Sequence, residues 1–482
     1  MKAVRIVSDC DRKKAFTHSF SKIPPAAYLS YFETLELVIL KRTHRFFCEN
    51  KIWQSFTPII HLRNPSHCKN LSDHFPKAKL IIKASACYIL QLCSPCQLAN
   101  IISLDFRNGP FSRIFNFSTL PKLTVLQLDN CYGLGLDDLN NMTQLVSLSL
   151  NFEVDRFRGS TLRKLTNLTK LSLRENTVIT DLDIELLPLR SLSLYNNRTI
   201  TPFVLKRLNL TQLDISIYAT AALSGEIIQC TTITDLTLTM ADINIIGKKV
   251  LASMTQLKKL TVQDPELLYE DCLKYLTNLT HLHFIGATKY EKLDLPSLQT
   301  IIIMSRWPWG YVPSLSLTNL THLELEVVSH LADISCLINL TYLKLTFYRN
   351  GITPPQIPIL PKKLKTLILL NLSSYDTINF VSLENLTTLE ISVENDKVIH
   401  HLPVHHNLKK LTIWSGNAQI NDHSLMQYTH VNHLTLLSLT TPLIGYCFEY
   451  MKGLLSLTIY RRKISDECHS QLIKRGIIVR DY

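Results

Sequence analysis

The sequence predicts an α/β fold in which short parallel strands stack along one curved sheet as a solenoid. Three observations support this prediction. The chain has 482 residues, which is too long for one ordinary hydrophobic core. Leucines two residues apart recur at a regular interval, and the recurrence keeps one phase from residue 101 to residue 460. Hydrophobic residues make up 46% and charged residues 19%, which is typical of a folded chain.

The repeat follows the pattern L-x-x-L-x-L, with successive matches 19 to 24 residues apart. A helix would place its apolar residues three and four apart, whereas leucines two apart share one face of a strand. A weaker match at Ile101, Leu104 and Phe106 precedes the others, so about 17 repeats are expected. The matches begin at Leu123, Leu145, Leu168, Leu189, Leu210, Ile233, Leu257, Leu279, Leu298, Leu320, Leu340, Leu364, Leu386, Leu408, Val431 and Leu454.

Three repeats carry the longer form L-x-x-L-x-L-x-x-N/C, which ends at Cys131, Asn176 and Asn197. This pattern resembles the leucine-rich-repeat family. The resemblance implies a leucine-rich-repeat solenoid, with a curved parallel sheet on the concave face and short helical or 3-10 returns on the convex face. The Asn-Leu-Thr triplet that recurs, as at Asn167, marks the start of each strand, and it is a glycan acceptor only in a secreted chain.

The expected organisation has three parts. Residues 1–97 form a small helical amino-terminal region, residues 98–460 form the solenoid, and residues 461–482 form a carboxy-terminal cap whose apolar run at 476–479 serves as a last strand or cap. The 19-residue interval between Leu279 and Leu298 leaves open whether the solenoid is continuous there.

The x positions of x-L-x-L-x point away from the leucine core into the concave surface. Many are serine, threonine or aspartate, as expected of a solvated face. Two regions depart from this and are predicted to contact a protein partner, because exposed aromatic, apolar and arginine side chains are typical of interfaces. These candidate partner-binding residues are Ile285, Ile302, Met304, Arg306, Trp307, Trp309, Tyr311, Trp414, Leu437 and Tyr460. Ile368 with Leu370 is a weaker candidate.

A second resemblance covers about residues 21–60. Ile23-Pro24, Leu29, Phe32, Leu35, Leu40, Arg45, Phe46 and Trp53 follow one another in an order similar to the F-box. The F-box is a helical motif that docks onto the Skp-type adaptor of a cullin ubiquitin ligase. The resemblance implies that Ile23, Pro24, Leu29, Phe32 and Leu35 bind the adaptor while the repeats hold the protein to be modified. The segment between Pro24 and Leu29 is about one helical turn shorter than in the family.

The resulting function hypothesis is a substrate receptor that presents a bound target to a ubiquitin ligase. The alternative is a stand-alone repeat scaffold or effector, in which residues 1–97 only cap the solenoid. Neither is an enzyme: the sequence lacks the G-x-x-x-x-G-K-[ST], G-x-G-x-x-G, H-E-x-x-H and G-x-S-x-G motifs. No cofactor or metal is expected, because Cys87, Cys93 and Cys96 and the histidines at 400, 401, 405 and 406 form incomplete ligand sets.

The formal charge of +12 is concentrated at the amino terminus. Residues 1–100 hold 15 Lys and Arg against 6 Asp and Glu, a balance of +9 that leaves +3 for the other 382 residues. No single stretch gathers five basic residues among aromatics, which argues against a nucleic-acid partner. No apolar run resembles a signal peptide or approaches the ~18 residues of a membrane span, so a cytoplasmic protein is expected.

Overall fold

The computed structural model divides the chain into two compact units, Met1–Ile233 (unit 1) and Thr234–Tyr482 (unit 2). Each is described here by itself. The structure describes residues 59–62, 79–84, 95–110, 117–132, 139–151, 159–197, 199–216, 231–239, 248–263, 270–286, 292–293, 295–304, 314–315, 317–327, 334–347, 359–371, 380–393, 406–415, 420–439, 442–460 and 464–481.

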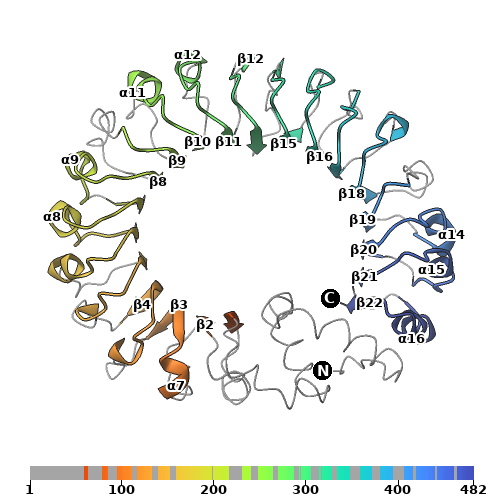
Figure 1. Cartoon of the computed structure of the whole chain (residues 1–482), viewed down its shortest axis with the longest axis horizontal. Helices are drawn as coiled ribbons and strands as arrows, with labels where there is room; N and C mark the ends of the chain where they lie inside the picture. The colour runs from red at the N-terminus through yellow and green to blue at the C-terminus, as the bar shows by residue number, and fades with distance from the viewer. Residues whose placement is uncertain are drawn as a thin grey trace, which may run out of the picture. The chain divides into compact units, whose positions relative to one another are not determined.

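Unit 1 contains a parallel sheet in which each strand pairs with the next one along the chain. Its strands lie on the inner side of the curved unit, and its short helices lie on the outer side (Figure 1). The strands are β1 (Ile59–Leu62), β2 (Lys79–Ala84), β3 (Ile101–Pro110), β4 (Val125–Tyr132), β5 (Ser147–Asn151), β6 (Lys170–Arg174), β7 (Ser191–Tyr195) and β8 (Gln212–Ser216).

Unit 2 repeats this arrangement, again with parallel pairing between successive repeats. Its strands are β9 (Asp235–Thr239), β10 (Lys259–Gln263), β11 (His281–Ile285), β13 (Thr300–Met304), β15 (His322–Val327), β16 (Tyr342–Phe347), β17 (Thr366–Leu370), β18 (Thr388–Val393), β19 (Lys410–Ser415), β20 (His433–Leu437), β21 (Ser456–Ile459) and β22 (Ile478–Asp481). The fold is a leucine-rich-repeat solenoid, as the sequence predicts.

The returns between strands are short, in keeping with repeats of about 22 residues. Unit 1 has α7 (Pro95–Leu98), η3 (Phe117–Thr119), η5 (Gly159–Lys164), α8 (Asp181–Ile184) and α9 (Pro202–Leu205). Unit 2 has α11 (Lys248–Ser253), α12 (Glu270–Leu273), η9 (Phe380–Ser382), α14 (Asp422–Leu425), α15 (Cys447–Tyr450) and α16 (Asp466–Lys474). None of the helices in these ranges is long and apolar enough to cross a membrane.

The core lies between the sheet and the returns and consists of the repeated leucines. In β6, Leu171 and Leu173 are fully buried between partly exposed neighbours, and the same alternation recurs in strand after strand. Burying one such leucine contributes about 1.5–3 kcal/mol, so the stacked leucines are the main source of stability. The concave side chains are therefore left free of a structural role in the core.

The Asn-Leu-Thr triplets join each repeat to the preceding one through their polar side chains. Asn167 Nδ2 donates to the carbonyl oxygen of Thr143 at 2.8 Å, and Thr169 Oγ1 donates to that of Val146 at 3.4 Å. In unit 2, Asn278 Nδ2 and Thr280 Oγ1 donate in the same way to the carbonyl oxygens of Thr255 and Lys258. Backbone carbonyls at the start of the strands are thereby satisfied, which explains why the triplet recurs.

Strand ends require a left-handed turn into the return segment. Glu175 and Asn196 directly follow β6 and β7, with φ of 53° and 46°, and Asn130 lies near the end of β4 with φ of 57°; each stands directly before the N/C position of the repeat. That N/C residue then closes the turn: Asn197 Oδ1 accepts hydrogen bonds from the backbone nitrogens of Thr199 and Ile200. The longer repeat pattern thus encodes the corner after the strand.

The sheet of unit 1 begins before the expected start of the solenoid, because β1 and β2 lie within 1–97, which was expected to be helical. In unit 2, β22 pairs with β21 and forms a last strand at the apolar run, one of the two roles expected for it. Leu80 and Ile82 of β2 are buried in alternation, but this strand lacks the leading leucine of the repeat pattern, so the pattern misses it. Residues 1–58, which include most of the F-box-like segment with Ile23, Pro24, Leu29, Phe32 and Leu35, lie outside the described residues.

The short interval between Leu279 and Leu298 does not interrupt the sheet. β11 and β13 pair in register along their whole length, from His281 opposite Thr300 to Ile285 opposite Met304. The return of this repeat contains the two-residue strand β12 (Lys292–Leu293), which pairs with β14 (Ser314–Leu315). An extended return spans the same distance with fewer residues than a helical one, so the repeat can be short.

Candidate functional site

The concave surface of each unit is formed by three side-chain positions per strand, which we number 1 to 3 along the strand. Parallel pairing aligns these positions in rows. His283 at position 2 of β11 stands opposite Ile302 of β13, which stands opposite Glu324 of β15, and the row continues through Lys344 of β16 and Ile368 of β17. Residues about 20 positions apart in sequence thus become neighbours about 4.8 Å apart.

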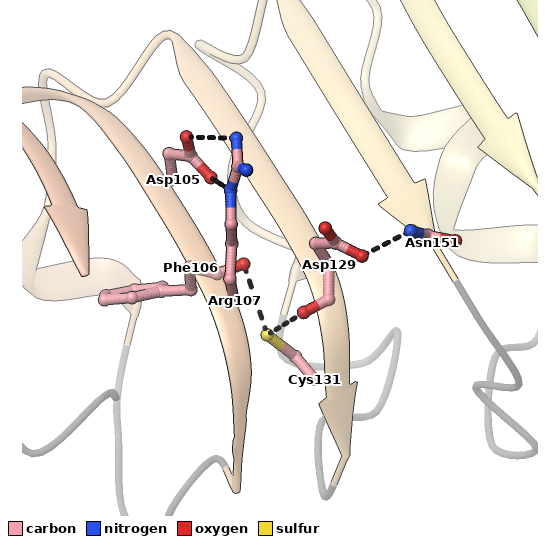
Figure 2. Close-up of polar contacts among 6 residues, drawn as sticks. All are labelled: Asp105, Phe106, Arg107, Asp129, Cys131 and Asn151. Carbon is pink, nitrogen blue, oxygen red and sulfur yellow. Dashed lines mark hydrogen bonds and ion pairs between the residues drawn. The ribbon is translucent and has the colours of Figure 1, made fainter. Parts of the chain in front are cut away.

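In unit 1 the concave side chains are polar and largely paired with one another (Figure 2). Arg107 donates two hydrogen bonds to the Asp105 carboxylate, at 3.1 and 3.2 Å, and Asn151 donates to Asp129. The Asp105 carboxylate raises the pKa of Arg107. These contacts pair several polar side chains of this face with one another.

The same pairing continues along unit 1. Ser193 Oγ donates to Asp214 at 3.1 Å, Ser216 Oγ donates to the same carboxylate at 3.0 Å, and the Arg174 guanidinium lies 4.0 Å from the ring centroid of Tyr195. A surface of this kind offers few apolar contacts to a partner.

In unit 2 the predicted apolar group is formed as expected from the sequence. Ile285, Ile302 and Met304 occupy neighbouring concave positions of β11 and β13, and all three are half-buried. We call these three residues the apolar cluster. Arg306, Trp307, Trp309 and Tyr311 follow β13 but lie outside the described residues.

A group of interacting polar residues, the polar cluster, borders the apolar cluster on β15 and β16. His322 Nε2 lies 2.9 Å from Glu324 Oε1, and Lys344 Nζ donates to Glu324 Oε2 at 3.3 Å. The imidazole of His322 stacks on the ring of Tyr342, with centroids 4.0 Å apart and an interplanar angle of 7°. Burial, followed by the nearby carboxylates of Glu324 and Glu390, raises the pKa of the Tyr342 phenol.

Two histidines of β11 complete this region. Burial lowers the pKa of His283, and burial together with the charge of Lys259 lowers the pKa of His281. His283 Nε2 is buried and forms no hydrogen bond within the described part of the chain. Buried polar atoms normally have a partner, and Asn151 Oδ1 of unit 1 is in the same situation within the described part of the chain.

The second predicted region, Trp414 with Leu437 and Tyr460, is also brought together. Trp414 stands opposite Leu437 in the pairing of β19 with β20, and Tyr460 directly follows β21. Trp414 is 42% exposed and Tyr460 is 39% exposed. The indole Nε1 of Trp414 donates to Glu390 Oε1 at 2.9 Å, which fixes the orientation of the ring. We call these three residues the aromatic cluster.

Between the two clusters, Ile368 and Leu370 of β17 are half-buried on the same face, in register with Lys344 and Thr346. The residues that sequence analysis missed are His322, Glu324, Tyr342, Lys344 and Glu390. They occupy concave positions 1 and 2 of their strands, so the residue types at these positions in every repeat are enough to find them. What the sequence does not show is that they bond to one another across strands.

Among the described residues, no group of three or more His, Cys, Asp or Glu side chains is arranged to hold a metal ion. Cys87, Cys93 and the histidines at 400, 401 and 405 lie outside those residues. The described concave face of unit 2 thus combines apolar, aromatic and hydrogen-bonding side chains, which is the make-up of a macromolecular interface.

Comparison with known proteins gives similarity in architecture. No family model matches the chain, and no curated protein matches it in sequence. A solved internalin from Listeria monocytogenes is 16% identical, with a TM-score of 0.31, covering 76% of this chain and 88% of the internalin. A leucine-rich-repeat protein of Leptospira interrogans is 19% identical, with a TM-score of 0.33, covering 80% and 91%. The mouse RP105/MD-1 complex is 13% identical, with a TM-score of 0.43, covering 88% and 78%. Partner and activity are not defined by similarity at this level.

Proposed function

We propose that this chain is a protein-binding repeat protein that holds a protein partner against the concave face of unit 2. One observation carries the proposal. Where unit 1 presents serines and paired polar groups, unit 2 presents the apolar and aromatic clusters on strands of its own sheet. Large side chains that are partly exposed in the free protein and lie close together are the usual centres of protein interfaces.

One detail supports a role of the aromatic cluster in binding. The hydrogen bond from Trp414 to Glu390 orients the indole before a partner arrives, which reduces the entropy lost on binding. Such a pre-oriented ring favours a defined partner surface.

For the role of this binding we propose a substrate receptor of a cullin ubiquitin ligase. The support is the F-box-like order of residues at about 21–60, most of which precede β1, the first strand among the described residues. In this role Ile23, Pro24, Leu29, Phe32 and Leu35 bind a Skp-type adaptor and the solenoid binds the target. The alternative is a stand-alone scaffold or effector that has the same concave site but no adaptor.

A co-purification experiment tests both the concave binding site and the proposed ligase role. The full chain, tagged, is expressed in cells of its source and recovered with its partners, alongside Trp414→Ala, Ile302→Ser and a Pro24→Ala/Leu29→Ala double variant. Loss of a concave contact at the centre of an interface costs about 2–4 kcal/mol, or roughly 30-fold or more in affinity. The concave variants should therefore lose the target but keep the adaptor, and the double variant should lose only the adaptor.

The matched control is Ser149→Ala, a change at a concave position of unit 1 that should keep both partners. Recovery of the same target by wild type, Trp414→Ala and Ile302→Ser would refute the concave site. Absence of any adaptor with wild type would refute the ligase role and leave the scaffold alternative. Thermal unfolding of each variant separates loss of binding from loss of fold.

A further inference from the structure

The amino-terminal edge of the sheet in unit 2 carries a group of lysines that come from separate stretches of the sequence. They stand in three alternate repeats, those of β17, β19 and β21. All six are exposed: Lys362, Lys363, Lys365, Lys409, Lys410 and Lys452. We call this group the basic edge. The repeat of β18, which lies between those of β17 and β19, places the acidic residue Glu384 at the same edge.

Backbone hydrogen bonds place these residues side by side. The carbonyl of Lys365 accepts from the backbone nitrogens of Thr387 and Thr388, and the carbonyl of Thr387 accepts from those of Lys409 and Lys410. Asn385 Nδ2 donates to the carbonyl of Lys362 at 3.1 Å. The lysines of β17 and β19 therefore lie two strands apart, roughly 10 Å.

Hydrogen bonds of the same kind connect the repeats as far as the end of the basic edge. The carbonyl of Lys409 accepts from the backbone nitrogens of Asn432 and His433, and Asn432 Nδ2 donates to the carbonyl of Gly453, which follows Lys452. His406 and His430 also lie here, with His406 Nδ1 2.8 Å from His430 Nε2. From β17 to β21 the edge spans roughly 19 Å, the length of about six extended residues.

The lysines are not used to stabilise the fold. Within the part of the chain that the structure describes, none of the six forms an ion pair. Lys363 Nζ donates to Asn339 at 2.8 Å and Lys409 Nζ to the carbonyl of His406 at 3.3 Å, both neutral acceptors. Like charges gathered without counter-charges repel one another, so their grouping costs stability unless an anionic partner neutralises it.

The corresponding edge of the other described repeats of unit 2 carries fewer lysines. The junctions of β11, β13, β15 and β16 carry Thr280, Gln299, Thr321 and Thr341, all neutral. The junction of β10 carries the exposed pair Lys258 and Lys259, and Lys259 Nζ lies 3.9 Å from Asp235. The largest group of exposed lysines at the described edge of unit 2 therefore lies beside the strands that carry the aromatic cluster.

We propose that the basic edge binds an acidic polypeptide segment, rich in Asp or Glu, of the partner protein. Its charge calls for an anion, and the protein partner proposed for the neighbouring concave face favours a polypeptide over a nucleic acid. Lys410 and Trp414 also lie on one strand, four residues or roughly 13 Å apart, so one segment can reach both. The choice of a polypeptide rests on the proposed function.

The test uses a fluorescent glutamate peptide of about twelve residues and measures its binding to the full chain by anisotropy. The variant Lys363→Glu/Lys365→Glu/Lys409→Glu should weaken binding by roughly tenfold or more, because it reverses half of the edge. The control Lys122→Glu/Lys170→Glu/Lys258→Glu changes the net charge by the same amount at other places and should bind like wild type. Raising the salt concentration should weaken the wild-type binding.

Three results would overturn the proposal. The edge variant could bind the peptide as well as wild type does, the two triple variants could lose binding equally, or an oligothymidylate of equal charge or an anionic vesicle could bind more tightly than the peptide. Trp414→Ala serves to separate the two sites. It should leave peptide binding within about twofold while it removes the protein partner, so failure of the concave site and failure of the edge give different patterns.

Discussion

The concave faces of the two units have the same strand backbone but carry side chains of different chemistry. In unit 1, position 2 carries Asp105, Ser149 and Ser193, and the polar side chains of this face largely bond to one another. In unit 2 the face carries Ile302 at position 2 of its strand and Trp414 at position 3, both with surface left for a partner. The leucines beneath are the same in both, so the difference lies in side chains that contribute little to the core.

This comparison shows how a solenoid separates stability from function. Alternate residues of each strand point to opposite faces, so the buried row can be kept while the concave row varies. A function carried by such a surface can be moved, enlarged or lost without refolding the chain. The comparison can be tested by substituting buried and concave residues of the strands in each unit.

The largest effect is expected for the buried row, and it should be alike in the two units. Leu171→Ala in unit 1 and Leu343→Ala in unit 2 each remove a fully buried side chain and should lower the free energy of unfolding by about 2–5 kcal/mol. Urea unfolding monitored by circular dichroism measures this. A cost in one unit several-fold below that in the other would break the premise that both share one scaffold.

Substitutions at concave positions should have different effects in the two units. In unit 1 they should mainly lower stability, and in unit 2 they should mainly weaken partner binding. Asp129→Ala removes the acceptor of the buried Asn151 side chain and should cost about 1–3 kcal/mol without changing partner affinity. Ile302→Ala in unit 2 truncates a half-buried side chain, so it should cost about 1 kcal/mol or less but weaken the partner complex.

Unfolding curves and partner titrations on the same samples provide the measurement. Asp129→Asn, which keeps an acceptor oxygen, should recover most of the stability lost in Asp129→Ala. If Asp129→Ala weakened the partner complex as much as Ile302→Ala, the assignment of binding to unit 2 alone would fail.

Sequence alone predicts the repeated part of this structure well, because each leucine is fixed by a periodic requirement of the core. Leu323 and Leu343 follow that pattern and are buried as expected. β2 escapes prediction because Leu80 and Ile82 satisfy the core without the full leucine pattern. The apolar and aromatic clusters could be located because large side chains stand out at concave positions.

The polar cluster and the basic edge could not be predicted as groups. Glu324 and Lys344 interact because parallel pairing places them opposite each other, and that register depends on the lengths of the returns. Likewise the lysines at 362–365 and at 409–410 form two short stretches far apart in sequence, and only stacking of the repeats brings them together. A pattern of contiguous basic residues therefore does not predict the basic edge.

The smallest expected effect is a pH dependence confined to unit 2. Burial lowers the pKa of His283 and of His281, so below the ordinary histidine pKa of about 6.5 the unfolded chain binds more protons than the folded one. This contribution to stability is fully present above that pH and is lost as the pH falls toward the lowered values. The charged groups that act on these imidazoles are Lys259, Asp235 and His322 for His281, and Glu324 for His283.

His283→Gln removes one of the two titrations, so the free energy of unfolding of this variant should fall less steeply between pH 7 and pH 5 than that of wild type. The control is Ile302→Ala, a neighbour that does not titrate and should lower stability equally across the range. Equal slopes for wild type and His283→Gln would show that burial does not lower the pKa of this imidazole in solution, and the expected pH dependence would then be wrong.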